Sequence, residues 1–465
     1  MRRCNNRGIT LIALVVSIIV LLIIAGVSIS MLAGQNGILE RVSQAKKITA
    51  EESQIEDTKL ALMEIETAYN TQDTETDRIS YFENALKLYT TPAGAKIKYE
   101  KGLITYNGEN NKNLVMKYNI DTGKIEKIGS DMNIQEYYSQ HPEYHIPKGF
   151  RYLTGTVNKG YVITDAAPSE TNGNEFVWIP VASEKDYVKK LGSKNGCMIE
   201  AVGNGGETPE KLGDISNAVK GDILGVGKIL GTSVESGLSS TASEAKIVNA
   251  AGGFWVGRYE TGVTQNTEIN PANGISEIYV KSGLQPYRKV SQTKALELAN
   301  NWKGSNNNNT ASSVEYQAGL ITGTQWDVMC DFISWDIADS DCTTWGNYKD
   351  ALSEKYTGYR SGADYTWSQC TDYEKTSDTI SVFQTGKFPN KLSGNLTVQK
   401  NIFDVAGNLW EWTTEVPTRN GNNRVRRGGS VYYSGSVYLA SSRDGLYSVG
   451  SYAWDVGFRL VLYVK

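Results

Sequence analysis

Residue types that could do redox or metal chemistry are few in this chain. Its five cysteines form no CxxC pair, so the sequence predicts neither a zinc ribbon nor a thioredoxin-like site. They are Cys4, Cys197, Cys330, Cys342 and Cys370. The last four allow three disulfide pairings, and the sequence leaves the choice among them open.

Histidine chemistry is also poorly supported. His141 and His145 have i,i+4 spacing, but Pro142 between them argues against a helical metal-binding face. We expect the surrounding residues 131–148 to be a linker. No Ser-His-Asp set can be assembled, because neither histidine lies in the region that follows, residues 149–465.

The segment 431–455 (VYYSGSVYLASSRDGLYSVGSYAWD) has a composition suited to binding. It is dominated by Tyr, Ser, Gly, Val and Ala and contains no Lys, Glu, Gln or Met. Tyrosine with small polar residues is typical of antibody paratopes, because Tyr gives a large amphipathic contact at low entropy cost while Ser and Gly adapt. The alternative is the aromatic core of a β-rich C-terminal domain.

Composition indicates a globular chain of two or three domains. The protein has 465 residues, of which 40% are hydrophobic and 21% charged. Its net charge of -4 gives no electrostatic footprint for nucleic acid, so we expect no nucleic-acid partner.

The N-terminus predicts a membrane anchor. Residues 9–32 carry no charge and are about long enough to cross a bilayer as one helix. A cleavable secretory signal has a shorter apolar core, whereas here the apolar run continues into charged, helix-patterned sequence. Arg2, Arg3 and Arg7 place the N-terminus inside the cell and the chain after about residue 35 outside, where disulfides are permitted.

This segment resembles the class III signal of type IV pilins and pseudopilins, in which a prepilin peptidase cuts after the Gly of a short basic leader. The resemblance implies cleavage between Gly8 and Ile9. Ala13 stands where pilins that pack into filaments usually have Glu. The missing carboxylate could not pair with a neighbouring subunit's amino terminus, which argues against incorporation into a filament. A plain single-pass anchor is the alternative.

A stalk and a small sheet are expected next. Apolar residues recur at threes, fours and sevens from Ile38 to Tyr69, which predicts an amphipathic helix. Continuous with the membrane segment, this helix would be on the order of 90 Å long, with Gly34 and Gly37 as points where it could kink. A coiled-coil stem is the alternative. Residues 80–130 alternate as short strands between turns, and pilin-like subunits share this layout.

The long C-terminal region carries a second resemblance. Four separated pieces occur in the order expected of the formylglycine-generating sulfatase-modifying family, whose fold is a variant of the C-type lectin fold. The pieces are Phe254–Glu260 (FWVGRYE), Gly319–Trp326 (GLITGTQW), Asp404–Thr413 (DVAGNLWEWT), and Arg424–Ser430 (RVRRGGS) with Gly457–Leu460 (GFRL).

The two resemblances together imply an α+β protein with a long N-terminal transmembrane and stalk helix, a small pilin-like sheet and a C-type lectin-fold domain. The expected order is a leader at 1–8, a transmembrane helix at 9–33, the stalk helix and sheet at 34–130, the linker at 131–148 and the C-type lectin-fold domain at 149–465.

The third and fourth pieces suit a fixed framework. Trp410 and Trp412 share one face of a regular strand and can cover one core. Arg459 can take a buried carboxylate as a bidentate partner. Asn408 and Glu411 offer oxygen ligands or loop-fixing hydrogen bonds, and the resemblance adds a structural calcium ion near them as a hypothesis.

The family's oxidase activity requires two C-terminal cysteines that bind copper and the substrate thiol. No cysteine follows Cys370, and Leu460 stands where a catalytic relative typically has Cys. We therefore predict that the protein is not an enzyme.

Domains of this type with such a C-terminal segment resemble the variable proteins of diversity-generating retroelements, in which a reverse transcriptase randomises template adenines. Randomised Asn codons reach Tyr, Ser, Asp, Gly, Ala, Val and Leu but never Lys, Glu, Gln, Met or Trp, and residues 431–455 obey this rule except at Trp454. The positions expected to stay constant are Arg427, Gly428, Gly429, Ser441, Arg443, Gly457 and Phe458. The positions expected to be exposed, variable and in contact with ligand are Tyr433, Ser442, Asp444, Gly445, Leu446, Tyr447, Tyr452 and Ala453, with Trp454 beside them.

These features predict a non-catalytic receptor or adhesin on the cell surface, held in the membrane by one helix. Its ligand is expected to be a protein or glycan on another cell, a phage or a surface, with a prepilin peptidase and pilus subunits as further partners. The first alternative is a minor pilin or pseudopilin whose head caps a filament. The second is an enzyme with non-oxidase chemistry.

Overall fold

The structure, a computed structural model, describes fifteen ranges of the chain. They are residues 17–22, 38–71, 77–87, 89–91, 94–100, 102–107, 113–187, 247–264, 277–304, 314–349, 359–361, 367–369, 382–387, 398–415 and 423–464. The chain divides into two compact units, Met1–Ile134 and Gln135–Lys465.

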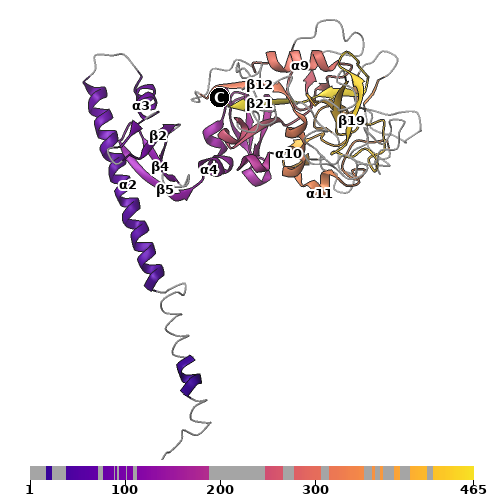
Figure 1. Ribbon diagram of the computed structural model, residues 1–465. Coiled ribbons are helices and arrows are strands. Elements are labelled where there is room, and N and C mark those ends of the chain that lie inside the picture. Colours follow the sequence, from indigo (N-terminus) through magenta and orange to yellow (C-terminus); the bar gives the residue numbers. More distant parts are fainter. Residues whose placement is uncertain are drawn as a thin grey trace, which may run out of the picture. The chain divides into compact units, whose positions relative to one another are not determined.

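The first unit joins a long helix to a small antiparallel sheet (Figure 1). Its helices are α2 (Ile38–Asn70) and α3 (Arg78–Leu86), and its strands, in their order across the sheet, are β1 (Tyr89–Thr90), β2 (Lys96–Glu100), β3 (Leu103–Asn107), β4 (Asn113–Asn119) and β5 (Lys124–Met132). The helix predicted from Ile38 to Tyr69 is α2, and the strands predicted within 80–130 are β1 to β5. Helix α3 was not predicted.

The core of the first unit forms where the second half of α2 meets the sheet. Leu62 and Ile65 of α2 and Phe82 of α3 are buried in one cluster with Ile97 and Ile104 of the sheet. By contrast, residues 40–50 of α2 are exposed on every side. The first part of α2 is therefore a stem that extends beyond the sheet it packs against (Figure 1).

The predicted membrane helix cannot be followed in the structure. Of residues 9–33 only 17–22 are described, and they are helical. The cleavage site at Gly8 and Ile9, and Ala13, lie outside the described residues. Within the described ranges, no helix is both long enough and apolar enough to cross a membrane.

Within the described residues, the second unit contains two larger sheets and three two-stranded sheets. In order across it, the six-stranded sheet has β12 (Tyr316–Leu320), β21 (Leu460–Val464), β9 (Gly253–Gly257), β8 (Glu175–Pro180), β7 (Val162–Thr164) and β6 (Arg151–Thr154). The four-stranded sheet has β19 (Arg443–Ser448), β18 (Asn423–Arg427), β17 (Trp410–Trp412) and β20 (Val456–Phe458). The two-stranded sheets pair β10 (Gly262–Val263) with β11 (Gln285–Pro286), β13 (Tyr359–Ser361) with β14 (Trp367–Gln369), and β15 (Val398–Gln399) with β16 (Ile402–Phe403).

Short helices cover the sheets. They are α4 (Ile134–Gln140), α9 (Gln292–Asn301), α10 (Gly323–Ile333) and α11 (Trp335–Ala338), with 3-10 turns η2 (Pro142–His145), η3 (Val157–Lys159) and η4 (Glu184–Asp186). Helix α10 begins with a capping box, in which Thr322 and Gln325 each accept a hydrogen bond from the other's backbone N–H. Ser291 caps α9 in the simpler way, by accepting from the Lys294 N–H.

The boundary between the two units lies within the predicted linker 131–148, at residue 134, but residues 135–148 are an ordered part of the second unit. Strand β5 continues to Met132, and α4 and η2 follow it. The indole N–H groups of Trp178 and Trp255 donate to the carbonyls of Ser139 and His145, each at 2.9 Å, and the His145 ring stacks on Trp178. The segment is ordered because it supplies acceptors and an aromatic face to two buried tryptophans.

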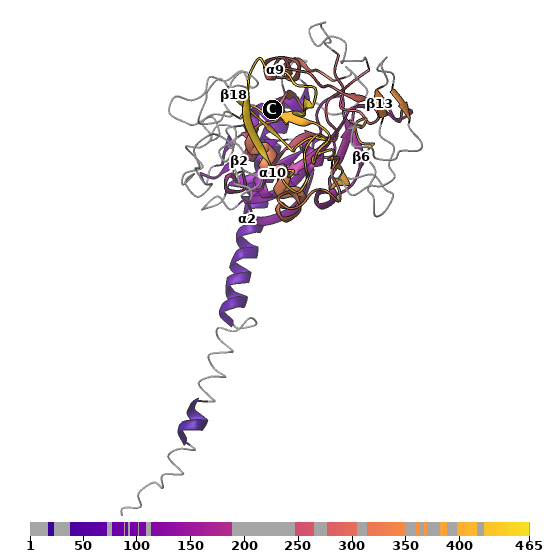
Figure 2. The ribbon, with the colours of Figure 1, turned by 90° about the vertical axis from the view of Figure 1, so that its right-hand side faces the viewer.

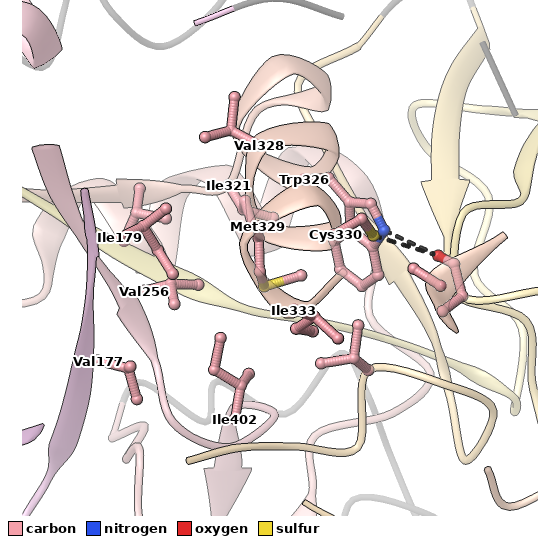
Figure 3. Close-up of a cluster of buried hydrophobic side chains, with 14 of the residues drawn as sticks. Val177, Ile179, Val256, Ile321, Trp326, Val328, Met329, Cys330, Ile333 and Ile402 are labelled. Atoms are coloured by element: carbon pink, nitrogen blue, oxygen red, sulfur yellow. Dashed lines mark hydrogen bonds between the residues drawn. The ribbon is translucent and has the colours of Figure 1, made fainter. Parts of the chain in front are cut away.

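The core of the second unit lies on both faces of the six-stranded sheet. On one face, Trp326, Met329 and Ile333 of α10 pack against residues such as Val177 and Val256 of the sheet (Figure 3). On the other face, a separate cluster contains residues of α9 and of the four-stranded sheet, including Trp410 and Trp412. Both tryptophans are fully buried in this one cluster, as their spacing predicted.

Replacing Phe82 by Ala should destabilise the first unit by about 3–5 kcal/mol, because the side chain is fully buried. All ten tryptophans of the chain follow residue 134, so tryptophan fluorescence reports on the second unit alone. Far-UV circular dichroism should show an earlier transition in Phe82→Ala, while the fluorescence transition stays in place. Ile79→Ala, at an exposed position of α3, is the matched control. Equal shifts in both signals would mean that the units do not unfold separately.

Candidate functional site

The predicted contact positions lie on the two segments that join the last strands of the four-stranded sheet, and on β19. Turns occupy residues 431–442 between β18 and β19, and a second set of turns leads from residue 449 to β20. Strand β19 pairs with β18 and is the edge strand of this sheet. The candidate site is therefore one edge of a sheet with the loops at its ends (Figure 1).

A buried ion-pair network, which we call the framework network, fixes this edge to α10. Arg427 of β18 donates to Asp327 of α10 at 2.5 Å, and its Nη1 lies 3.4 Å from Glu415. Arg443 of β19 also donates to both Asp327 and Glu415. All four side chains are almost completely buried, and two guanidinium groups balance two carboxylates. Figure 2 shows β18 close to α10, as these bonds require.

The loop 431–442 is fixed at both ends, and the framework network holds one of them. Arg427 donates to the carbonyls of Ser441 and Ser442, each at 3.0 Å. At the other end, Gly428 and Gly429 adopt φ values of 89° and 78°. A Cβ atom at Gly429 would lie 2.8 Å from the Tyr438 carbonyl oxygen, so the backbone is too close for a side chain.

The contact positions predicted to be exposed differ widely in their burial. Ser442 and Asp444 are 0% and 7% exposed, and Gly445 is buried as well, so the prediction of exposure was wrong for these three. Ser442 lies beside the framework network, and Asp444 is drawn in by an arginine of the neighbouring strand. Tyr452 is 64% exposed. The half-buried positions are Tyr433, Tyr447, Ala453 and Trp454, and the side chain of Leu446 lies outside the described part of the structure.

Sequence reasoning missed part of the surface. Tyr432 is 49% exposed and Val437 is 37% exposed, and neither was among the predicted contacts. The Tyr432 ring lies edge-on to Trp454, with 5.1 Å between the ring centroids. Because residues 431–438 form turns and not a strand, alternation along the sequence could not indicate which tyrosine points outward. Their presence in a tyrosine-rich segment was the available signal.

An aromatic cage surrounds Arg426 beneath this surface. The guanidinium carbon lies 4.1 Å from the ring centre of Tyr447 and 4.8 Å from that of Trp410. Tyr433 and Tyr438 pack edge-on against Trp410. Cation–π contacts of this kind hold a guanidinium in place and orient its plane. We call these four aromatic residues the aromatic cage.

A second buried network surrounds Arg459, which precedes β21. Its Nε and Nη2 atoms donate to the two carboxylate oxygens of Glu411, at 3.0 and 2.6 Å, which confirms the predicted bidentate partner. Glu260 lies nearby and accepts from the Asn408 side chain and the Leu409 N–H. Asp404 accepts from the Gly386 N–H. Three carboxyl groups therefore share the field of one guanidinium.

Burial and the closeness of the carboxyl groups to one another raise their pKa values. Burial raises the pKa of Asp404 to about 7, although the Gly386 N–H and Arg459 act in the opposite direction. Burial also raises the pKa of Glu260 well above its usual value, and Asp404 and Glu411 raise it further. Burial raises the pKa of Glu411 against the pull of Arg459. The folded unit therefore retains protons that an unfolded chain would release.

The calcium ion suggested near Asn408 and Glu411 does not fit the donor set. Both oxygens of Glu411 accept from Arg459. The Asn408 Oδ1 atom accepts from the Asn347 side chain and the Phe383 N–H, at 2.9 and 2.8 Å. Within the described ranges, no three His, Cys, Asp or Glu side chains are arranged to hold a metal ion. The loop-fixing role expected as the alternative accounts for both residues.

The described cysteines are not suited to nucleophilic or copper chemistry. Cys330 and Cys342 are free and fully buried, and they lie on either side of Ala440: one thiol is 4.0 Å from its carbonyl oxygen and the other accepts from its N–H. Burial raises the pKa of Cys342 to about 12 and raises the pKa of Cys330 as well. Both thiols are therefore protonated at neutral pH. Cys197 and Cys370 lie outside the described residues.

Comparison with known proteins supports the predicted fold of the second unit. Residues 240–464 match the model of the sulfatase-modifying factor enzyme 1-like domain, which has a C-type lectin-like fold. No curated protein matches the chain. Among solved structures, variable protein 1 of Treponema denticola is similar with a TM-score of 0.26 and 16% identity, over 45% of this chain and 84% of that chain. CarF is similar with a TM-score of 0.22 and 15% identity, over 46% and 87%.

Replacing Glu411 by Ala should lower the free energy of unfolding of the second unit by about 3–5 kcal/mol, because the change leaves the buried Arg459 without its bidentate partner. Urea unfolding followed by tryptophan fluorescence measures the loss. Asp336→Ala, which removes an exposed carboxylate of α11, should change the same quantity by less than about 0.5 kcal/mol. Similar small changes in both variants would show that the pair is not structural.

Stability of the second unit should fall as the pH rises from about 4 to about 7. The pKa of Asp404 is higher in the folded unit, so the folded state binds more protons in this range and loses up to about 1.4 kcal/mol per pH unit. Asp404→Asn, which cannot ionise and suits the left-handed φ of 56°, should make the profile less steep, while Glu260 and Glu411, whose pKa values are also raised, keep part of the slope. Asp336→Asn should keep the slope. A steep profile in Asp404→Asn would assign the slope to other groups.

Proposed function

We propose that this protein is a non-catalytic ligand-binding receptor or adhesin, and that residues 431–455 form its contact surface. The observation that carries the proposal is that buried, fixed residues and exposed aromatic residues lie close together in this part of the sequence. Arg427, just before the segment, and Arg443, within it, are held in the framework network, while Tyr432 before Arg443 and Tyr452 after it are 49% and 64% exposed. A surface of this kind can change its contacts while the fold beneath it stays constant.

The exposed composition favours binding over a purely structural role. The apolar surface of aromatic side chains in exposed loops has an unfavourable free energy of hydration unless a partner covers it. Tyr is the residue that gives a large contact area at low entropy cost. Tyr432, Trp454 and Tyr452 supply such area from two separate loops. The ligand class that suits it is a protein or glycan on another cell, a phage or a surface.

Oxidase chemistry of the formylglycine-generating type is not part of the proposal. No cysteine follows Cys370 in the sequence, and Leu460, at the position of the family's catalytic cysteine, is a fully buried residue of β21. The thiols of Cys330 and Cys342 are closed off by burial. A binding role needs none of these groups.

We further propose that a single N-terminal helix, residues 9–33, anchors the protein in the cell membrane after cleavage at Gly8, and that α2 holds the second unit outside the cell. The uncharged sequence of residues 9–32 and the exposed stem 40–50 support this arrangement. The same stem, with its helix-and-sheet unit, also favours a second candidate function, a minor pilin or pseudopilin. Ala13 argues against that candidate, because a filament subunit usually carries Glu there.

Diversification by a retroelement is the most specific part of the proposal, and population sequencing tests it. The 3′ end of the gene and its flanking DNA would be sequenced across many cells of the source. We expect substitutions at exposed and half-buried positions, such as Tyr433, Tyr447 and Tyr452, to match adenines in a nearby near-identical repeat. Arg427, Gly429, Arg443 and Phe458 should stay constant.

The framework codons are the internal control, because a general mutator or sequencing error would change them at the same rate as their neighbours. An invariant segment without a second copy nearby would overturn diversification. The better account would then be an adhesin of fixed specificity or a pilus cap.

A further inference from the structure

The aromatic cage holds a cation whose hydrogen-bonded carboxylate partner, Asp444, comes from the proposed variable segment. Arg426 is 1% exposed, and its Nε and Nη2 atoms donate to one oxygen of Asp444, at 3.0 and 2.7 Å. Arg426 itself precedes the segment 431–455, whereas Asp444 lies within it. The positively charged residue therefore lies outside the proposed variable segment, whereas the carboxylate that neutralises it lies inside.

The guanidinium is not saturated by Asp444. Its Nη1 atom is buried and has no hydrogen-bond acceptor in good geometry among the described residues, although the Tyr433 side chain also interacts with the guanidinium. The nearest carboxylate oxygen, from Asp455, is 3.9 Å away and accepts from Ser430 through its other oxygen. The indole N–H of Trp410, in the same cage, is also buried without an acceptor among the described residues. Two buried donors that lack acceptors favour a ligand that brings oxygen.

The cage holds Arg426 in place independently of Asp444. Trp410 and Tyr447 stack on the guanidinium. Beside it, the ring centroids of Tyr433 and Tyr438 lie 4.5 Å from each other. If residue 444 were Gly or Ser, the aromatic contacts would remain while a space of carboxylate size opened at the guanidinium edge. Arginine binds planar carboxylates better than other anions of that size, because its fork of N–H donors matches two oxygens.

We propose that Arg426 in the aromatic cage is a carboxylate-binding site, which Asp444 fills from within this chain and which a ligand carboxylate fills when residue 444 carries no acid. The proposal rests on the proposed function, since it takes residues 431–455 as the contact surface. It adds the chemical class of ligand group that the surface accepts and names a constant residue that recognises it. Residue 444 thus decides whether the site is closed or open.

Acetate rescue of Asp444→Gly tests this assignment on the full-length protein in detergent. Loss of the buried partner should lower the unfolding midpoint by about 5–10 °C. Sodium acetate should then restore about half of that loss in a saturable manner, whereas sodium chloride at equal ionic strength should not. Wild type should show no difference between the two salts. Asp444→Ser, a smaller disturbance of β19, serves if the glycine variant does not fold.

The double variant Arg426→Met/Asp444→Gly is the matched control, because it keeps the space and removes the guanidinium, and it should show no rescue by acetate. Glucuronate and N-acetylglutamate, each against its uncharged amide, then distinguish a sugar from a peptide as the source of the carboxylate. Rescue by chloride equal to that by acetate, or equal rescue of the double variant, would overturn the proposal. Neither result bears on whether the gene varies. The rescue experiment can therefore overturn the carboxylate site without overturning diversification, and population sequencing can do the reverse.

Discussion

The second unit depends on one buried guanidinium. Arg459 donates to the Glu411 carboxylate of β17 and to the carbonyls of Gly257 in β9 and Phe403 in β16, so a single side chain ties the four-stranded sheet to the six-stranded sheet. Burying this charge is tolerable only while every donor has an acceptor. That requirement constrains the identity of Glu411 and the turn at Asn408. It places no constraint on the residues of the surface above them.

The other arginines extend the same principle toward the surface. Arg427 and Arg443 share two carboxylates in a balanced set, whereas Arg426, one residue away on β18, depends on Asp444 and on aromatic rings. The adjacent residues Arg426 and Arg427 of β18 therefore have different roles. One side holds the loop 431–442 to α10, and the other presents a cation to the candidate site. In the proposed function, the strand both supports the contact surface and contributes to it.

Sequence reasoning succeeded where a local pattern or a motif determines the outcome. The heptad-like spacing of Ile38 to Tyr69 gave helix α2, and the Trp410 and Trp412 alternation gave a buried strand. It failed where the outcome depends on partners distant in sequence. Asp444 is polar and in a loop-like segment, but Arg426 draws it inside, and residues 135–148 are ordered because buried tryptophans need their carbonyls. Composition cannot reveal such acceptors, because they are backbone atoms.

The position of β21 has a consequence for how the protein is made. This last strand lies between β12 and β9, so the six-stranded sheet cannot close until residues 460–464 have been synthesised. Pairings between such distant parts of a chain form late and slowly. Completion of the six-stranded sheet is therefore a late step in the folding of the second unit.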